Sequence, residues 1–374
     1  MRLFECQSCG NPVHFENAAC LACGAHLGYL PAENRMVALQ PDGPAFRSIA
    51  RPEQHFLFCS NAEHDVCNWL VPEGGNAFCP ACRFNRTVPD LTAPQNLDLW
   101  RRIEVAKRYV FYSILRWRLP VQDRLENPEH GLAFDFLADS QAPQGGGAVM
   151  TGHDNGLITL NISEADDAER ERRRTSMNEP YRTLIGHFRH ELGHYFWDTM
   201  VASDPQTLER CRAVFGDERQ DYGQALQRHY AEGAPIDWQD AFISTYATAH
   251  PWEDFAETWA HYFHITDALE TAAAFGIRTR PRLKEAADLA VSVDFDPYNA
   301  HSAQELIDAW VPLTVALNSV NRSMGQRDLY PFVLSQPVME KLDFIHSLIH
   351  AGAEQQAERD MRWQTMCGPV MQAA

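Results

Sequence analysis

The sequence predicts an α+β fold in which a small cysteine-rich segment precedes a larger, mainly α-helical part with a small mixed β-sheet. Three observations support this prediction. Eight of the ten cysteines lie within the first 82 residues, strand-like alternation is confined to two stretches between residues 131 and 163, and most segments beyond residue 180 have apolar residues at helical spacing. The 374 residues are 45% hydrophobic, enough for one large domain or two smaller ones, each with its own core.

The charge of the chain argues against a polyanion as its partner. It has 50 acidic and 32 basic residues, a formal net charge of −18, which repels nucleic acid and anionic membrane surfaces. Residues 1–90 contain six arginines, no lysine and nine acidic residues, so the cysteine-rich segment also lacks a basic stripe for phosphate contacts. We therefore expect no nucleic-acid partner and no membrane partner.

The beginning of the chain gives no sign of export. The sequence MRLFECQSCG lacks the basic start and apolar core of a signal peptide. No run of about 18 apolar residues occurs anywhere in the chain. We expect a soluble, cytoplasmic protein.

The spacing of the first four cysteines predicts a structural zinc site. They form two CxxC pairs with ten residues between the pairs: Cys6, Cys9, Cys20 and Cys23. Paired thiolates on a tight turn supply half of a tetrahedral zinc shell, and a second pair completes it. Disulfides or free thiols are the alternatives, and a cytoplasmic location favours zinc over disulfides.

A second, looser group of cysteines predicts another structural zinc site. Its members are Cys59, Cys67, Cys79 and Cys82. Because seven residues separate Cys59 from Cys67, either a loop replaces one tight turn, or His55 or His64 takes the place of a thiolate. We expect the two zinc ribbons or knuckles to bind a protein partner.

Loop-forming residues predict a domain boundary near residue 92. The stretches GYLPAENRMVALQPDGPAFRS (28–48) and FNRTVPDLTAPQN (84–96) are rich in Pro, Gly, Asn and Asp, which is typical of loops. The chain therefore divides into residues 1–92, with both cysteine groups, and residues 93–374. In the second part, Cys211 and Cys367 have no partner at metal-binding spacing and are expected to be free thiols.

The second part is predicted to begin with a helix and two strands. From Leu97, LDLWRRIEVAKRYVFYSILRWRL has helical periodicity that ends before Pro120. GLAFDFLAD and LITLNIS alternate as half-buried strands do. The second strand is either an edge strand that binds extended substrate backbone or an ordinary core strand.

Helices are predicted for most of the remaining chain. The first is YRTLIGHFRHELGHYFWDTM, with Asn178 as its N-cap and Pro180 in its first turn. Further helical segments are DPQTLERCRAVF, YGQALQRHYA, WEDFAETWAHYFHITDALETAAAF and PVMEKLDFIHSLIHAG.

The string HELGH in the first of these helices is a candidate metal-binding motif. On a helix, His190 and His194 lie one turn apart on the same face, so both imidazoles can bind one metal ion. Glu191 beside them can hold the metal-bound water and take its proton as that water attacks a carbonyl group. Gly193 has no side chain to crowd the metal, and Arg189 is expected to be solvated.

A catalytic zinc ion needs a third protein ligand, which the acidic helix HPWEDFAETWAHYFH can supply. Glu253 and Glu257 share a face, so one can bind the metal while the other accepts the free N–H of a ligand histidine. Asp254, His261 and His264 are rivals for the third position. If His261 or His264 instead filled a fourth position, the site would be closed, and the protein would be a non-catalytic scaffold for protein interactions.

These motifs resemble the gluzincin class of metallopeptidases, which have HExxH on one helix and a glutamate on a later one. In lethal-factor-like members, the glutamate opens a turn that ends in FAE and a tyrosine lies seven residues before it; here Glu253 begins EDFAE and Tyr246 lies seven residues upstream. The resemblance implies that Glu253 is the third ligand and Glu257 its supporting partner. It also implies that the Tyr246 hydroxyl stabilises the oxyanion. Asp198, where thermolysin-like enzymes also have an acid, is expected to be structural.

Over nearly its full length, the chain resembles bacterial zinc-binding metallopeptidases with N-terminal zinc ribbons. The cysteine groups, HExxH, PWEDFAETWAHYFHI and NRSMGQRDLYPFVLS carry this resemblance. It implies a zincin-like metallopeptidase domain over residues 93–374, one catalytic and two structural zinc ions, and a peptide or protein substrate. The GAMEN string of gluzincin aminopeptidases is missing, which leaves exopeptidase action without support. We expect zinc-dependent hydrolysis of peptide bonds, with the zinc-bound water activated by Glu191.

Overall fold

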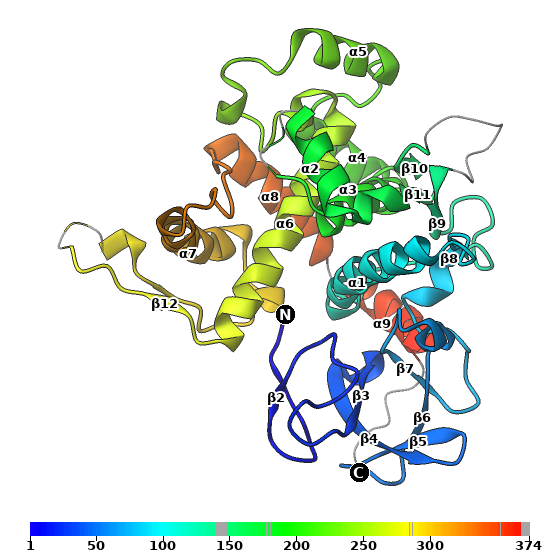
Figure 1. Cartoon of the computed structure of the whole chain (residues 1–374). Helices are drawn as coiled ribbons and strands as arrows, with labels where there is room; N and C mark the ends of the chain where they lie inside the picture. The colour runs from blue at the N-terminus through cyan, green and yellow to red at the C-terminus, as the bar shows by residue number, and fades with distance from the viewer. Residues whose placement is uncertain are drawn as a thin grey trace. The chain divides into compact units, whose positions relative to one another are not determined.

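The computed structural model describes residues 1–139, 149–176, 179, 181–283, 285, 287–351 and 353–367 (Figure 1). The chain forms two compact units: Arg2–Arg170 with Gly352–Ala374, and Met1 with Glu171–Ala351. The class is α+β, as predicted, with both cysteine groups in a β-rich region and a mainly helical part after it. The division into residues 1–92 and 93–374 stays a prediction. Among the described residues, no helix is both long and apolar enough to span a lipid bilayer.

The cysteine-rich region is built on an antiparallel five-stranded sheet with the order β3-β4-β5-β6-β7. A cluster of buried apolar side chains forms its core: Leu30, Val37, Leu39, Phe56 and Leu70. The strands are β3 (His26–Leu30), β4 (Arg35–Asp42), β5 (Ala45–Ser48), β6 (His55–Phe58) and β7 (Leu70–Pro72). A separate hairpin pairs β1 (Phe4–Glu5) with β2 (Pro12–Val13).

The expectation of a loop over residues 28–48 is wrong, because this stretch contains part of β3 and all of β4 and β5. Some of its turn-forming residues lie between the strands, whereas Gly28 lies in β3 and Pro41 in β4. Pro31 opens the 3₁₀ helix Pro31–Glu33, and Gly43 has a φ of +61° in the turn between β4 and β5. The run from Met36 to Leu39 is buried at every position, so it lacks the alternation that marks a half-buried strand.

The same unit contains α1 (Pro94–Arg116), α9 (Ala353–Cys367) and a four-stranded mixed sheet with the order β10-β11-β9-β8. The strands are β8 (Asn85–Thr87), β9 (Ala133–Leu137), β10 (Gly152–Asp154) and β11 (Leu157–Asn161). β8 and β11 both run parallel to β9, whereas β10 is antiparallel to β11. Because β11 lies between β10 and β9, the edge-strand alternative for LITLNIS is wrong.

Helix α6 (Pro251–Ala274) is the central element of the other unit. It contacts α3 (Leu184–Phe196), α7 (Ala303–Ser323) and α8 (Gln336–Ile349) (Figure 1). It can pack on several sides because most of its residues are buried, including Phe255, Trp259 and Phe263. The other elements are α2 (Asp167–Ser176), a π-helical turn (Trp197–Val201), α4 (Pro205–Phe215), α5 (Tyr222–Glu232), β12 (Arg278–Thr279) and β13 (Val291–Ser292).

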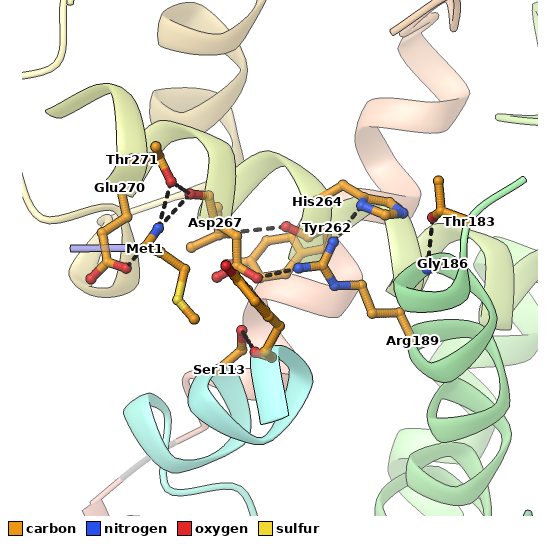
Figure 2. A network of polar contacts seen from close by, with 12 residues as sticks. Met1, Ser113, Thr183, Gly186, Arg189, Tyr262, His264, Asp267, Glu270 and Thr271 are labelled. Atoms are coloured by element: carbon orange, nitrogen blue, oxygen red, sulfur yellow. Dashed lines mark hydrogen bonds and ion pairs between the residues drawn. The ribbon is translucent and has the colours of Figure 1, made fainter. Parts of the chain in front are cut away.

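Helix α3 begins later than the sequence suggests. Its N-cap is Thr183, whose side-chain oxygen accepts a hydrogen bond of 3.0 Å from the N–H of Gly186 (Figure 2). Asn178 and Pro180, the predicted cap and first-turn residue, lie outside the described residues. The helix nevertheless contains the whole HELGH string.

Candidate metal centres

The sulfur atoms of the first cysteine group lie at the spacing of a zinc tetrahedron. Cys6 Sγ is 3.8 Å from Cys23 Sγ, and Cys9 Sγ is 3.6 Å from Cys20 Sγ. Four sulfurs about 2.3 Å from a zinc ion lie about 3.8 Å from one another. A glycine with positive φ follows each pair and donates a hydrogen bond of 2.8 Å to the carbonyl oxygen of the pair's first cysteine. These glycines are Gly10 (φ +74°) and Gly24 (φ +75°).

The second cysteine group is more deeply enclosed than the first. All four of its cysteines are buried, whereas Cys9 and Cys23 of the first group are exposed. Cys67 Sγ lies 3.8 Å from Cys79 Sγ. The backbone N–H of Cys79 also points at the sulfur of Cys59, at 3.4 Å. Hydrogen bonds of this kind stabilise the thiolate form that binds metal.

The histidine alternatives and the later cysteines lie outside both groups. His55 Nε2 pairs with Asp42 at 3.0 Å, and His64 is likewise absent from the group that the four cysteines form. Cys211 is buried and free of a disulfide, as predicted, and burial raises the pKa of its thiol to about 12. The side chain of Cys367 lies outside the described residues.

Helix α1 places buried charged residues beside the second cysteine group. Local sequence patterns do not reveal this arrangement. Lys107 and Arg108 are 0% and 4% exposed, and the Lys107 ammonium lies 2.9 Å from the carboxylate of Glu104. Burial alone lowers the pKa of Lys107, but the negative charges of Glu104 and Cys82 outweigh it and raise this pKa. Lys107 is paired with Glu104, so Arg108 is the cation left to offset negative charge on the neighbouring thiol groups.

The third candidate centre joins α3 to α6. His190 Nε2 and His194 Nε2 are 3.2 Å apart, and Glu253 Oε2 lies 2.9 Å from the first and 3.4 Å from the second. Nitrogen and oxygen ligands about 2.0–2.1 Å from a tetrahedral zinc ion lie about 3.3 Å from one another. The three distances therefore match the edges of one face of a zinc tetrahedron.

The hydrogen bonds around this centre also fit a bound cation. The carboxylate of Glu257 can only accept, so His190 Nδ1 carries a proton, and the lone pair of His190 Nε2 faces Glu253 Oε2. Glu253 Oε2 is buried and makes no regular hydrogen bond, and two acceptors at this distance repel unless a cation lies between them. Burial lowers the pKa of His190, but the neighbouring carboxylates of Glu253 and Glu257 outweigh it and raise this pKa well above its usual value, so a proton on Nε2 would compete with a metal ion for the same place.

Glu257 makes the contact that the sequence predicts for it. Its Oε1 lies 2.7 Å from His190 Nδ1, and its Oε2 accepts a hydrogen bond of 2.6 Å from the Ser244 hydroxyl. Burial raises the pKa of Glu257, but the hydrogen bond from His190 outweighs it and the pKa is lowered. Glu257 therefore stays a carboxylate and fixes the tautomer and orientation of the histidine ring.

The rivals for the third position have other partners. Asp254 pairs with Lys341 Nζ at 2.6 Å, and burial raises its pKa to about 7 although Lys341 acts in the opposite direction. His261 Nδ1 lies 2.8 Å from the Tyr330 hydroxyl, and His264 contacts Arg189. Among the residues that the structure describes, the ligand group on α3 and α6 has three members, so neither histidine closes a fourth position.

Arg189 is not solvated as the sequence suggests. It is 3% exposed and forms a buried ion pair with Asp267 on α6, beside its contact with His264 (Figure 2). Its partner lies 78 residues away in the chain, which a local sequence pattern cannot reveal. The pair ties α3 to α6 next to His190.

Two tyrosines and Glu191 surround the third centre. The Tyr246 ring lies 5.8 Å from the His190 ring between centroids, in the 3₁₀ helix Tyr246–Thr248. Tyr222, which no sequence motif indicates, donates a hydrogen bond of 2.6 Å to Glu253 Oε1. Burial, followed by the charge of Glu253, raises the pKa of both phenols, and the charge of the buried Glu191 adds to this effect. Both tyrosines therefore keep the proton that they can donate.

Trp252 and Asp198 lie at the far end of the histidine pair. The Trp252 ring lies against the His194 ring, tilted by 34° with 3.7 Å between centroids. Asp198 is half-buried in the π-helical turn Trp197–Val201 and is not a member of the ligand group. Its predicted structural role stays a prediction.

Comparison with known proteins shows which family this chain resembles. Residues 96–348 match the family described as "Putative zinc-binding metallo-peptidase", and residues 3–93 match a zinc-ribbon domain. Relatives described as uncharacterized proteins occur in Mycobacterium bovis and in two strains of Mycobacterium tuberculosis. Each is 42% identical over 352 residues, which cover 93% of this chain and 95% of the relative. No solved structure matches the chain.

Proposed function

The chain belongs to this family of zinc-binding metallo-peptidases, and on that premise we propose that it hydrolyses peptide bonds at the centre formed by His190, His194 and Glu253. The observation that carries the proposal is the 2.9–3.4 Å spacing of their three donor atoms on two helices. Glu191 follows the first ligand directly, which is the arrangement of a gluzincin-type peptidase.

Each residue then has a separate task. His190 and His194 would hold a zinc ion through Nε2, and Glu253 would hold it through Oε2. When bound, zinc supplies Lewis-acid polarisation and lowers the pKa of a coordinated water to about 7. Glu191 accepts a proton at its carboxylate from the attacking water and later transfers it to the leaving amine. Tyr246 donates a hydrogen bond from its hydroxyl to the carbonyl oxygen as negative charge develops there.

The alternative of a non-catalytic scaffold finds less support. It needs a fourth protein ligand at this centre, and the residues suited to that position by sequence are His261 and His264. Both are in other contacts, with Tyr330 and Arg189 respectively. An open position is what a catalytic zinc requires.

We propose structural roles for the other two zinc ions, one in each cysteine group. The zinc-ribbon match and the tetrahedral spacing of the sulfurs support this assignment. The substrate class is a peptide or protein, and the ribbons bind a protein partner or the substrate itself.

Zinc content and peptide cleavage test the function together. We expect three zinc ions per chain in the wild type and in Glu191→Gln, and two in Glu253→Ala, measured by elemental analysis after dialysis against a weak chelator. A peptide library made from a digested proteome, read by mass spectrometry, offers many different peptide sequences to the enzyme at once. Glu191→Gln should lower cleavage by about 10²–10⁴-fold because it removes the general base.

Glu209→Gln is the matched control, since Glu209 is exposed on α4. It should leave both zinc content and cleavage unchanged. Cleavage by Glu191→Gln at the wild-type rate would contradict the mechanism, and a wild-type content of two zinc ions in the cysteine groups would contradict the site.

A further inference from the structure

Hydrogen bonds of His250 hold together the two ends of the segment between α4 and α6, beside the third centre. His250, the N-cap of α6, accepts a hydrogen bond at Nδ1 from the N–H of Trp252 (3.1 Å). In the corresponding neutral tautomer, His250 carries its proton on Nε2. This N–H donates a hydrogen bond of 3.1 Å to the carbonyl oxygen of Gln220. A single histidine therefore caps α6 and holds the other end of the segment next to it.

This closure places Tyr222 beside a proposed metal ligand. Asp221 caps α5 by accepting a hydrogen bond of 2.8 Å from the N–H of Gln224, so Tyr222 is the first residue of that helix. The Tyr222 ring packs between His250 and Trp252, at 5.3 Å and 5.8 Å between centroids. Its hydroxyl reaches Glu253 Oε1 from there.

The two oxygens of Glu253 consequently have different surroundings. Oε1 accepts the hydrogen bond of 2.6 Å from Tyr222, and Oε2 faces the Nε2 atoms of His190 and His194. A carboxylate can bind a metal through one oxygen or through both. An oxygen that already accepts a short hydrogen bond is a poorer ligand, so the hydroxyl selects Oε2.

We propose that Tyr222 is a positioning residue that holds Glu253 as a one-oxygen metal ligand. This inference rests on the proposed function, because it requires a metal ion at the third centre. It separates the two tyrosines: Tyr222 acts on the ligand, and Tyr246 acts on the substrate. The contact also holds α5 in place, since Ala225 is the one buried residue of that fully described helix.

The test compares Tyr222→Phe with Tyr230→Phe. Both remove a phenolic hydroxyl from α5, but Tyr230 is 63% exposed and makes no contact with Glu253 in the described structure. Zinc affinity is measured by competition with a chromophoric chelator. Loss of an outer-shell partner typically lowers metal affinity by about 10–100-fold, and we expect this loss for Tyr222→Phe alone.

Cobalt substitution provides a readout that does not depend on activity. The visible absorption of Co²⁺ at the third centre is isolated by subtracting the spectrum of Co²⁺-loaded Glu253→Ala, which retains the cysteine sites. With both carboxylate oxygens free to bind, Tyr222→Phe should show weaker bands of a higher-coordinate ion. Tyr230→Phe should keep the wild-type spectrum.

The outcomes distinguish this inference from the proposed function. Wild-type affinity and an unchanged Co²⁺ spectrum in Tyr222→Phe overturn the positioning role while the metal site stands. A loss of thermal stability that is equal in the metal-free and zinc-loaded proteins, with unchanged affinity, assigns Tyr222 a purely structural role and also overturns it. If the wild-type protein binds zinc in the two cysteine groups alone, the third centre is not a zinc site, and both proposals fail.

Discussion

Gly193 on α3 and Ala256 on α6 meet so closely that a Cβ on Gly193 would lie 2.9 Å from Ala256 Cα. The glycine therefore does more than leave room for a metal ion, as its sequence position suggests. It allows the backbones of two helices to approach at the level where His194 and Glu253 face each other. The geometry of the third centre depends on this contact.

Replacing Gly193 with alanine should separate these helices. The added methyl group meets backbone rather than a flexible side chain, so we expect a loss of about 1–3 kcal/mol in the free energy of unfolding. The third zinc ion should also be lost, with two ions left per chain. Thermal unfolding and elemental analysis measure both effects.

Gly223→Ala is the control for that substitution. Gly223 lies in the first turn of α5, where a Cβ would be 3.5 Å from Asp221 Oδ1, an ordinary contact. Three zinc ions are expected, with a stability equal to the wild type or higher by up to about 1 kcal/mol because alanine restricts the unfolded chain. An alanine at 193 that keeps the third zinc ion would show that the helices can move apart without disturbing the ligands.

Glu257→Ala should weaken zinc binding at the third centre. It removes the acceptor that lies 2.7 Å from His190 Nδ1, so the ring loses both its orientation and its fixed tautomer. We expect an affinity about 10–100-fold lower by chelator competition. Ser244→Ala removes the donor to Glu257 Oε2 and the acceptor of the Ala247 N–H but leaves the His190 contact, so it should have a smaller effect. An equal loss in both variants would argue against a direct role for the His190 contact.

The two cysteine groups should release zinc at different rates. Cys9 and Cys23 are exposed, while every cysteine of the second group is buried and therefore less accessible to a chelator. In a Glu253→Ala background, which removes the third centre, release to excess EDTA should occur in two phases. Cys9→Ser should abolish the fast phase and Cys79→Ser the slow one; a single phase would contradict the difference in exposure.

Acid should destabilise the helical unit through His261. Burial lowers the pKa of His261 from 6.5 to about 4, with Glu257 opposing the shift and Arg189 adding to it. Between these two pH values the unfolded chain binds a proton that the folded chain does not. The stability present above pH 6.5 is therefore lost as the pH falls, by about 1.4 kcal/mol per pH unit within the window.

Comparison with His261→Gln isolates this contribution. The variant lacks the titrating group, so the stability difference between it and the wild type should narrow between pH 7.5 and pH 5. Urea unfolding at both pH values measures the difference, and effects that both proteins share cancel. Parallel pH dependences would assign the acid sensitivity to other groups.

The sequence predicts those parts of the site that follow from helix periodicity. His190 and His194 are one turn apart, and Glu253 and Glu257 share a face, so helix periodicity marks all four as candidates before the fold is known. The choice of Glu253 as third ligand over its rivals rests on the family resemblance. Tyr222 could not be found in this way, because its approach to Glu253 depends on how a segment of 31 residues folds back.

Contacts that form only in the folded chain limit the prediction of the fold as well, because local sequence patterns do not show them. Arg189 and Lys107 look like surface cations until their partners, Asp267 and Glu104, are placed beside them in three dimensions. The strands within residues 28–48 were hidden for a different reason. Their Pro and Gly residues are typical of a loop, although Pro31 and Gly43 lie at the turns between strands and Gly28 and Pro41 lie within strands.

The hydrogen bond between His250 and Gln220 fixes both ends of the segment that contains Tyr222 and α5, so part of this segment can vary in length and sequence. A loop whose ends are already joined can change length cheaply, since doubling it alters the closure free energy by only about 0.6 kcal/mol. Residues 233–240 can therefore change in length while the ligands stay where they are, whereas Ser244 and Tyr246, later in the same segment, face the third centre.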